Sequence, residues 1–216
     1  MDVCFRDVIT NPLKLKIPLF PICVVSNIAY MFYQGLTSSK RYLKSLLLSN
    51  IFGTYVFGSF VVLLLKNALM DSRCNVHPNS VSGHAFFNYY FFMSWFVTMK
   101  DFRRKSLIHR SLFIIVELLL SSSFMLTYFG GYHTPRQILY GTLVAILFLL
   151  YLVFIVKRLR PYLSFGINVI GTLTVMLVGF NGNGLKPGFN AYVVPFISWA
   201  IISLFVMWRY NTKKMK

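Results

Sequence analysis

Charged residues are scarce in this chain, and acidic residues are the scarcest. Only 12% of the 216 residues are charged, and five Asp and Glu stand against 22 Lys and Arg. Soluble domains average about 25% charged and about 45–50% apolar residues. Here 56% of the residues are hydrophobic and 18% are aromatic. This composition excludes an ordinary water-soluble fold, and the length suits a single domain.

Several signals of other protein classes are also missing. The three cysteines follow no disulfide or zinc spacing, and no Gly-rich phosphate loop or Gly-x-Ser-x-Gly elbow is present. The sequence has no long linker, low-complexity tract or internal repeat. The net charge of +17 does not indicate nucleic-acid binding, because the basic residues form short clusters between apolar runs. We expect no metal, no cofactor and no nucleic-acid partner.

What the sequence does contain is a series of apolar runs, most of them long enough to cross a bilayer, which takes roughly 17–25 residues. They predict an all-α, polytopic transmembrane helical bundle of six or seven spans, with residues 1–216 as one integral membrane domain. The runs are 17–34, 46–65, 85–99, 112–129, 138–156, 162–180 and 192–208. The third is short, the sixth contains three glycines, and the first is interpreted as a retained span.

The basic residues predict an orientation. If every run spans, 15 of the 22 Lys and Arg fall on one side, which an excess of positive charge marks as cytoplasmic. They are Lys40, Arg41, Lys44, Lys100, Arg103, Arg104, Lys105, Arg110, Lys157, Arg158, Arg160, Arg209, Lys213, Lys214 and Lys216. The carboxyl terminus is then cytosolic, where Lys213 and Lys214 resemble a dilysine signal that retrieval machinery reads to return proteins to the endoplasmic reticulum. A lysine-rich tail also suits any cytoplasmic terminus.

Three short polar stretches end the predicted spans on the opposite, non-cytoplasmic side. They cover residues 66–73, 77–84 and 132–137. In a bundle these ends can meet around one wet pocket, where ionisable groups at membrane depth usually mark a site.

Each stretch has a functional and a structural interpretation. Lys66 and Arg73 are seven residues apart, about two helical turns, and can bind a phosphate or simply extend to the interface. Ser82, Gly83 and His84 precede an aromatic helix. In the functional interpretation, the small residues let an oxyanion approach the free N–H groups of the helix, and His84 donates a proton. In the structural interpretation, Ser82 only caps the helix and His84 is a polar side chain at the interface.

The third stretch surrounds His133. Thr134 can cap a helix that starts at Pro135, which places His133 at the helix mouth and Gln137 one turn on. Gln137 is then near enough to hold the imidazole. The structural alternative is an ordinary loop histidine.

Together the three stretches resemble the signature motifs of the type 2 phosphatidic acid phosphatase superfamily, which are metal-independent membrane lipid phosphatases. Lys66 and Arg73 match the first motif, Ser82-Gly83-His84 the second and His133 the third. The resemblance implies a lipid-phosphatase-like core at about residues 60–160. It also implies that His133 attacks phosphorus and that His84 protonates the leaving group. Lys66, Arg73, Ser82 and Gly83 then bind the phosphate, and Gln137 orients His133.

The sequence departs from that pattern in ways that point to particular branches. Cys74 and Val81 replace prolines, Leu126-Thr127 replaces Ser-Arg, and Gln137 replaces Asp. Residues 132–141 look like those of dolichyl diphosphatases, which keep the arginine. The fat storage-inducing transmembrane (FIT) family, linked to lipid droplets and acyl-CoA diphosphatase activity in the endoplasmic reticulum, lacks that arginine and is slightly preferred.

The expected function is therefore hydrolysis of a lipid phosphate, lipid diphosphate or acyl-CoA-type substrate at the lumenal face of the endoplasmic reticulum. Three alternatives remain open at this point. They are a dolichyl-diphosphate phosphatase of the glycosylation pathway, a sphingomyelin-synthase-like phosphotransferase and a non-catalytic lipid-binding membrane protein. The loss of the arginine at Thr127 is consistent with a slow enzyme, another substrate or an inactive relative.

Overall fold

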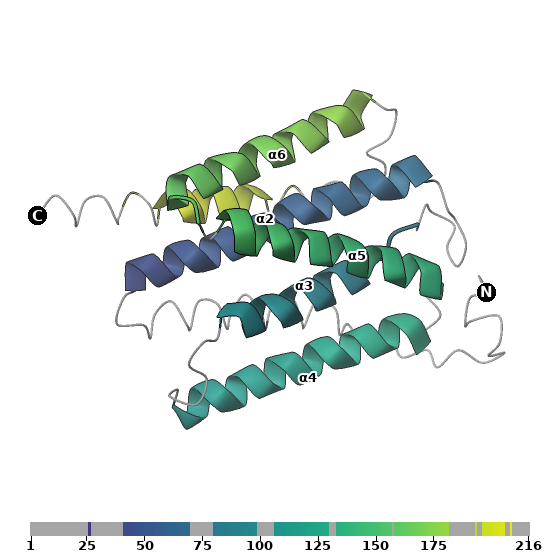
Figure 1. Cartoon of the computed structure of the whole chain (residues 1–216), viewed down its shortest axis with the longest axis horizontal. Helices are drawn as coiled ribbons and strands as arrows, with labels where there is room; N and C mark the ends of the chain where they lie inside the picture. Colours follow the sequence, from purple (N-terminus) through teal and green to yellow (C-terminus); the bar gives the residue numbers. More distant parts are fainter. Residues whose placement is uncertain are drawn as a thin grey trace, which may run out of the picture. The chain divides into compact units, whose positions relative to one another are not determined.

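The described part of the protein is helical apart from short connecting segments. The computed structural model describes residues 41–69, 80–98, 106–129, 133–156, 158–181 and 196–205, with single positions 26, 193 and 208. Within these ranges the chain forms α2 (Arg41–Leu69), α3 (Gly83–Thr98), α4 (Leu107–Phe129), α5 (Pro135–Tyr151) and α6 (Pro161–Asn181) (Figure 1). A five-residue π-helix, Leu152–Val156, continues α5. The all-helical prediction is confirmed for these residues.

The described helices overlap six of the seven predicted runs, and α2 and α4 each begin five residues earlier than predicted. Three of the helices are long and apolar enough to cross a membrane, at Asn50–Leu69, Pro135–Val156 and Tyr162–Gly179. A shorter apolar helix covers Phe196–Phe205. Helix α3 has 16 residues, so the third run is short in the structure as well. Apart from Ser26, the first run lies outside the described residues.

Local signals at the helix starts explain several of these boundaries. The hydroxyl oxygen of Ser106 accepts a hydrogen bond from the backbone N–H of His109 at 3.4 Å, which caps α4. Helices α5 and α6 each begin at a proline, Pro135 and Pro161. Proline suits the first helical position, because its missing N–H has no intrahelical partner there.

The described helices expose large apolar side chains and bury several polar ones, unlike the helices of a soluble protein. Apolar side chains such as Leu118, Leu147 and Ile170 are 61%, 63% and 66% exposed, whereas Asn88 and Asn168 are buried. Apolar outer faces suit surrounding lipid tails, and polar groups inside a bundle find partners on neighbouring helices. The described helices therefore have the character of membrane-embedded elements.

The chain divides into two compact units. One comprises Met1–Tyr30 and Leu65–Leu149, and the other comprises Met31–Leu64 and Leu150–Lys216. The polar stretches at 66–73, 77–84 and 132–137 all belong to the first unit.

The second unit is held by a small polar network and an aromatic cluster. The Asn168 side chain accepts a hydrogen bond from the Tyr151 hydroxyl at 3.2 Å and donates one to the Thr54 hydroxyl at 3.5 Å. Buried Trp199 packs with Val56 and Phe60. The buried Asn168 amide thereby has partners for both its oxygen and its nitrogen within the unit.

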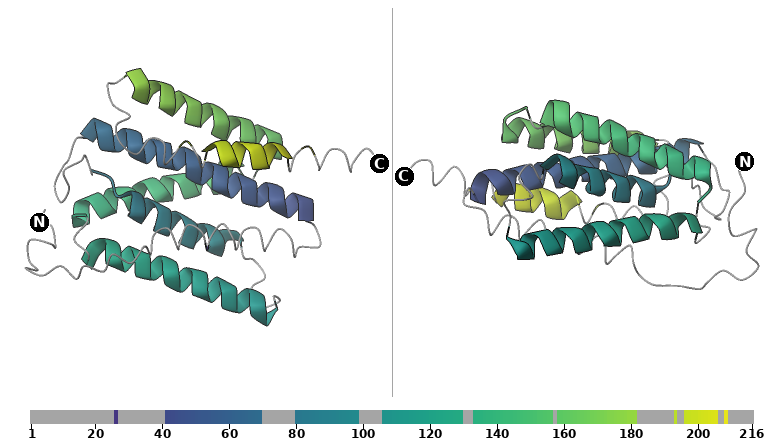
Figure 2. Two further views of the ribbon diagram at one scale, coloured as in Figure 1. Left: turned by 180° about the vertical axis from the view of Figure 1, so that it is seen from behind. Right: turned by 60° about the horizontal axis from the view of Figure 1, so that its bottom comes forward.

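Helix α3 is the centre of the first unit. It lies beside α4, as Figures 1 and 2 show, and its Phe86 ring meets Phe148 of α5 edge-on at 6.0 Å between centroids. Phe86, Phe87, Tyr90 and Phe91 are each almost completely buried. The aromatic residues after His84 therefore belong to the buried core, and Phe86 packs the first turn of α3 against α5.

Candidate active site

The start of α5 is fixed by a reciprocal capping box. The Gln137 N–H donates to the Thr134 hydroxyl oxygen at 3.3 Å, and the Thr134 N–H donates to Gln137 Oε1 at 3.1 Å. This is the Thr-x-x-Gln form of the motif, in which the side-chain oxygen of each residue accepts a hydrogen bond from the backbone N–H of the other. The sequence prediction of Thr134 as the cap and Pro135 as the first helical residue is confirmed.

The same amide oxygen orients His133. Gln137 Oε1 lies 3.3 Å from His133 Nδ1, and His133 is only 3% exposed. Because Oε1 already accepts from the Thr134 N–H, it is the oxygen end of the amide, and Nδ1 of His133 must be the donor. The tautomer with hydrogen on Nδ1 leaves a lone pair on Nε2. A histidine in this state can act as a nucleophile or a base through Nε2.

The start of α3 is joined directly to the start of α5. The Ser82 hydroxyl oxygen accepts a hydrogen bond from the Ala85 N–H at 3.1 Å, so Ser82 caps α3. The Ser82 N–H donates to the Gln137 carbonyl at 3.0 Å. Since Gln137 also holds His133, one residue ties the second polar stretch to the third.

A glycine makes this close approach possible. A Cβ atom added at Gly141 would collide with the Ser82 carbonyl oxygen and would lie 3.1 Å from the Ala85 Cβ. Gly141 therefore allows α5 to lie against the backbone turn that precedes α3. The glycine positions that turn relative to His133.

His84 and His133 face each other across the joined helix starts. Their ring centroids are 5.9 Å apart, with the planes tilted by 58°. Burial, followed by the positive charge of Lys66, lowers the pKa of His84 to about 4. Burial, then His84 and Lys66, lowers the pKa of His133 to about 3, against the opposing effect of the Gln137 hydrogen bond. Both imidazoles are neutral at neutral pH in the absence of a bound anion.

Lys66 completes the cluster from the end of α2. Its Nζ lies 3.8 Å from the position that a Cβ on Gly83 would occupy. The Ser80 hydroxyl donates to the carbonyls of Leu65 and Lys66, at 3.4 and 3.2 Å respectively. The last turn of α2 is thereby fixed to the segment that leads into α3.

Six predicted site residues are therefore gathered in one place. They are Lys66, Ser82, Gly83, His84, His133 and Gln137. The Ser82 N–H is committed to Gln137, whereas Gly83 is the first residue of α3 and its N–H has no acceptor within the helix. The cluster combines a cation, a helix N-terminus and two neutral imidazoles, which are the groups needed to bind and transfer a phosphoryl group.

Other predicted residues cannot be placed in this cluster. Arg73, Cys74, Lys213 and Lys214 lie outside the described residues. Position 127 belongs to α4, but its side chain also lies outside them. Among the described residues, no group of three His, Cys, Asp or Glu is arranged to hold a metal ion.

Two contributors were not identified from the sequence. Gly141 was noted only as part of the run that resembles dolichyl diphosphatases, and Ser80 only as part of the second polar stretch. The weak signal for Gly141 was a glycine one turn after Gln137 in an otherwise apolar helix, which often marks a packing contact. The bonds from Ser80 to carbonyls at the end of α2 have no sequence signature.

In comparisons with protein-family models, curated proteins and solved structures, the chain has no significant match.

Proposed function

We propose that this chain is a membrane-embedded hydrolase that acts through a phosphohistidine. It cleaves a phosphoester or pyrophosphate bond of a lipid phosphate, a lipid diphosphate or an acyl-CoA-type substrate. The observation that carries the proposal is the facing pair His84 and His133, 5.9 Å apart between ring centroids. His133 is held by the side-chain carbonyl of Gln137, whose Oε1 lies 3.3 Å from Nδ1. This contact leaves Nε2 of His133 available for attack, and we assign the role of acid and base to His84.

In the first proposed step, Nε2 of His133 forms a bond to phosphorus while the bond from phosphorus to the lipid oxygen breaks. The ring becomes cationic, and the Gln137 Oε1 that accepts from Nδ1–H stabilises it. His84 gives a proton to the leaving oxygen. Lys66 and the Gly83 N–H stabilise the charge on the phosphoryl oxygens.

In the second step, water attacks phosphorus and the P–N bond breaks. His84 takes the proton from water, inorganic phosphate leaves, and His133 regains its lone pair. The low pKa of His84 means that it must gain a proton when the anionic substrate is bound. A nearby negative charge favours this change, because it stabilises the imidazolium.

The proposal includes six or seven spans and a setting in the endoplasmic reticulum membrane. The concentration of basic residues at 40–44, 100–110, 157–160 and 209–216 supports a cytosolic carboxyl terminus and a lumenal active site. Lys213 and Lys214 then serve as the retrieval signal. The FIT-like features at Cys74, Val81 and Thr127 favour acyl-CoA or lipid phosphates over dolichyl diphosphate as the substrate.

Product analysis tests this proposal. The full chain is reconstituted in nanodiscs and supplied with phosphatidic acid labelled in its phosphate, dolichyl diphosphate or acyl-CoA. Released phosphate, or the phosphorylated fragment of acyl-CoA, supports a hydrolase. A new phospholipid would identify a transferase instead. No product from any of the three would favour a lipid-binding protein.

Two variants separate the roles of the histidines. His133→Ala should abolish hydrolysis of every substrate, because no covalent intermediate can form. His84→Ala should lower kcat/KM for a natural lipid phosphate by about 10²–10⁴-fold but spare kcat/KM for an activated aryl phosphate, whose leaving group departs without a proton. The comparison uses kcat/KM because this quantity reports the first step, before His84 activates water. Both variants are checked for folding in detergent. Full activity of His133→Ala on the natural lipid would sink the phosphohistidine mechanism.

A further inference from the structure

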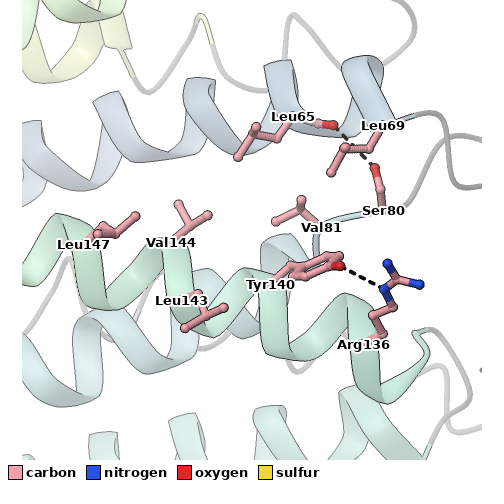
Figure 3. A pocket seen from close by; sticks show the side chains of 9 residues that line it. All are labelled: Leu65, Leu69, Ser80, Val81, Arg136, Tyr140, Leu143, Val144 and Leu147. Atoms are coloured by element: carbon pink, nitrogen blue, oxygen red, sulfur yellow. Dashed lines mark hydrogen bonds between the residues drawn. The ribbon is translucent and has the colours of Figure 1, made fainter. Parts of the chain in front are cut away.

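A groove of about 360 Å³ runs along α5 within the first unit, as Figure 3 shows. Its walls come from the last turns of α2, from Ser80 and Val81, and from five residues of α5. The size falls in the range of roughly 300–1,000 Å³ that is typical of small-molecule sites. The groove lies beside the histidine pair, and the residues that line it take no part in the reaction proposed above.

The polarity of the residues that line the groove changes along its length. Ser80, Arg136 and Tyr140 lie toward one end, and the remaining walls are Leu and Val side chains. Arg136 Nε donates to the Tyr140 hydroxyl at 2.8 Å, and its guanidinium carbon lies 5.5 Å from the centre of that ring. A cation fixed at the head of an apolar channel is complementary to an amphiphile with an anionic head and a hydrocarbon chain.

The length and position of the groove fit one leaflet of a bilayer. Arg136 and Leu147 line its two ends, and eleven residues of helix correspond to about 16 Å along the axis. Half of a hydrocarbon core of about 30 Å is about 15 Å. Arg136 is the second residue of the apolar helix Pro135–Val156, so the charged end lies at the start of that candidate span and Leu147 lies deeper within it.

The deep end is open at the side. Leu143 and Leu147 line the groove, yet they are 46% and 63% exposed. In a bilayer these side chains meet lipid tails directly. A chain can therefore enter the groove sideways from the leaflet.

The charged end adjoins the histidine site through the backbone. Val81 immediately precedes the cap Ser82, and Arg136 immediately precedes Gln137. Ser80 is bonded to the carbonyl of Lys66. A molecule whose chain lies in the groove would therefore have its head at the edge of the histidine site.

We propose that the groove binds one hydrocarbon chain of an anionic membrane lipid, with Arg136 on the head group and Leu147 at the end that limits chain length. The inference rests on the proposed function in treating this lipid as the substrate. It also assigns to Arg136 a guanidinium contact with the phosphate region of the lipid.

Photo-cross-linking tests the binding step without requiring turnover. The probe is phosphatidic acid with a diazirine at the end of one acyl chain, at low mole fraction in phosphatidylcholine nanodiscs that hold the full chain. We expect saturable labelling around Leu143 and Leu147. Unlabelled phosphatidic acid in excess should reduce it at least about tenfold, and neutral diacylglycerol of the same chain length should not.

Two matched substitutions on α5 test the chain-length role. Leu147→Trp fills the deep end, whereas Leu139→Trp changes a side chain that is 55% exposed and does not line the groove. Leu147→Trp should raise KM for a long-chain lipid phosphate about tenfold and leave a short-chain, water-soluble lipid phosphate unaffected, because pocket-size changes discriminate by roughly 10–200-fold. Leu139→Trp should match the wild type on both. Arg136→Gln should reduce the saturable labelling at least about tenfold.

The results separate this inference from the proposed function. Labelling that is not saturable, or lies away from the residues that line the groove, overturns the groove as a binding site even where hydrolysis is observed. Equal behaviour of Leu147→Trp and Leu139→Trp on the long-chain substrate overturns the chain-length role. Saturable labelling at Leu147 with no hydrolysis of any lipid phosphate would retain the lipid site and refute the hydrolase proposal.

Discussion

Gln137 Oε1 lies 3.3 Å from Nδ1 of His133 and 3.1 Å from the backbone nitrogen of Thr134. The second contact identifies the atom as the oxygen of the amide, and the first then assigns a hydrogen to Nδ1 of His133. A capping interaction, whose ordinary role is to start a helix, thus also selects the tautomer of the proposed nucleophile.

Substitution of Gln137 tests this double role. Gln137→Glu keeps an oxygen at the same reach and should retain both hydrogen bonds and most of the activity. Gln137→Leu removes both. A hydrogen bond to a charged group is worth roughly 1.5–3 kcal/mol, so kcat should fall about 10- to 100-fold. Steady-state kinetics on an aryl phosphate measures this effect.

Thr134→Ala is the matched control, because it removes the reciprocal cap and leaves the Gln137 side chain in place. It should destabilise the protein by about 1 kcal/mol with little change in kcat. An equal loss of kcat in Thr134→Ala and Gln137→Leu would show that the contact with His133 is only structural.

The contact between Gly141 and Ser82 is a second point at which packing determines the site. Gly141→Ala places a methyl group against the Ser82 carbonyl and should cost about 1–3 kcal/mol, as overpacking does elsewhere. It should also lower activity, because the shifted turn carries Ser82 and His84. Thermal unfolding in detergent and the aryl phosphate assay measure the two effects.

Gly166→Ala provides the comparison. A Cβ at Gly166, in α6, meets nothing within 4 Å. The substitution should be neutral or stabilise by up to about 1 kcal/mol, since alanine favours the helix. Equal effects of the two substitutions would contradict the close approach of α5 to the start of α3.

The sequence was sufficient to predict the approximate positions of the described helices and the capping arrangement around His133, for identifiable reasons. Long apolar runs determine helix position in a membrane protein, because every backbone polar group must be satisfied within the segment. The Thr-Pro-x-Gln pattern at 134–137 predicts the capping interaction by itself, because both partners lie within four residues of each other. The link from Ser82 to the Gln137 carbonyl and the groove beside Tyr140 depend on how α3 packs against α5, and no local pattern carries that information.

The buried neutral histidines should make stability depend on pH. The pKa values of His84 and His133 lie at about 4 and about 3, below the usual 6.5. At pH values below about 6.5 and above these lowered pKa values, the unfolded chain binds protons that the folded chain does not. The stability of the folded protein therefore falls as the pH decreases from about 6.5 toward 4. The unfolding midpoint in detergent should drop over this range. The double variant His84→Gln with His133→Gln should show a weaker pH dependence, and an unchanged slope would contradict the buried neutral state.

The orientation of the chain can be tested independently of activity. Single cysteines at positions 69 and 105 are introduced into a background without native cysteines, and sealed cytosol-out microsomes are labelled with an impermeant maleimide. Position 69 is chosen because Leu69, at the end of α2, is 55% exposed. Position 105 should react at once, because the basic cluster marks the cytosolic side, and position 69 should react only after permeabilisation. Protection of position 105 in sealed vesicles would reverse the proposed topology and place the histidine site in the cytosol.

The pH dependence of catalysis distinguishes His84 from His133 most directly. His133, with a pKa of about 3, remains neutral from pH 5 to 8 and can attack throughout. His84, with a pKa of about 4, loses its protonated share about tenfold for each pH unit above that value in the free enzyme. A natural lipid phosphate needs this proton, and an activated aryl phosphate does not.

The ratio of the two kcat/KM values should therefore decrease about tenfold per pH unit from pH 5 to 8. The second pKa of a phosphate ester lies near 6 and is lower for an activated aryl phosphate, so the ionisation of each substrate is measured separately and divided out of its kcat/KM. In His84→Gln the ratio should be low and independent of pH. A flat, high ratio in the wild type would mean that the leaving oxygen takes its proton from another source, and His84 would then be a packing neighbour of His133 instead of the general acid.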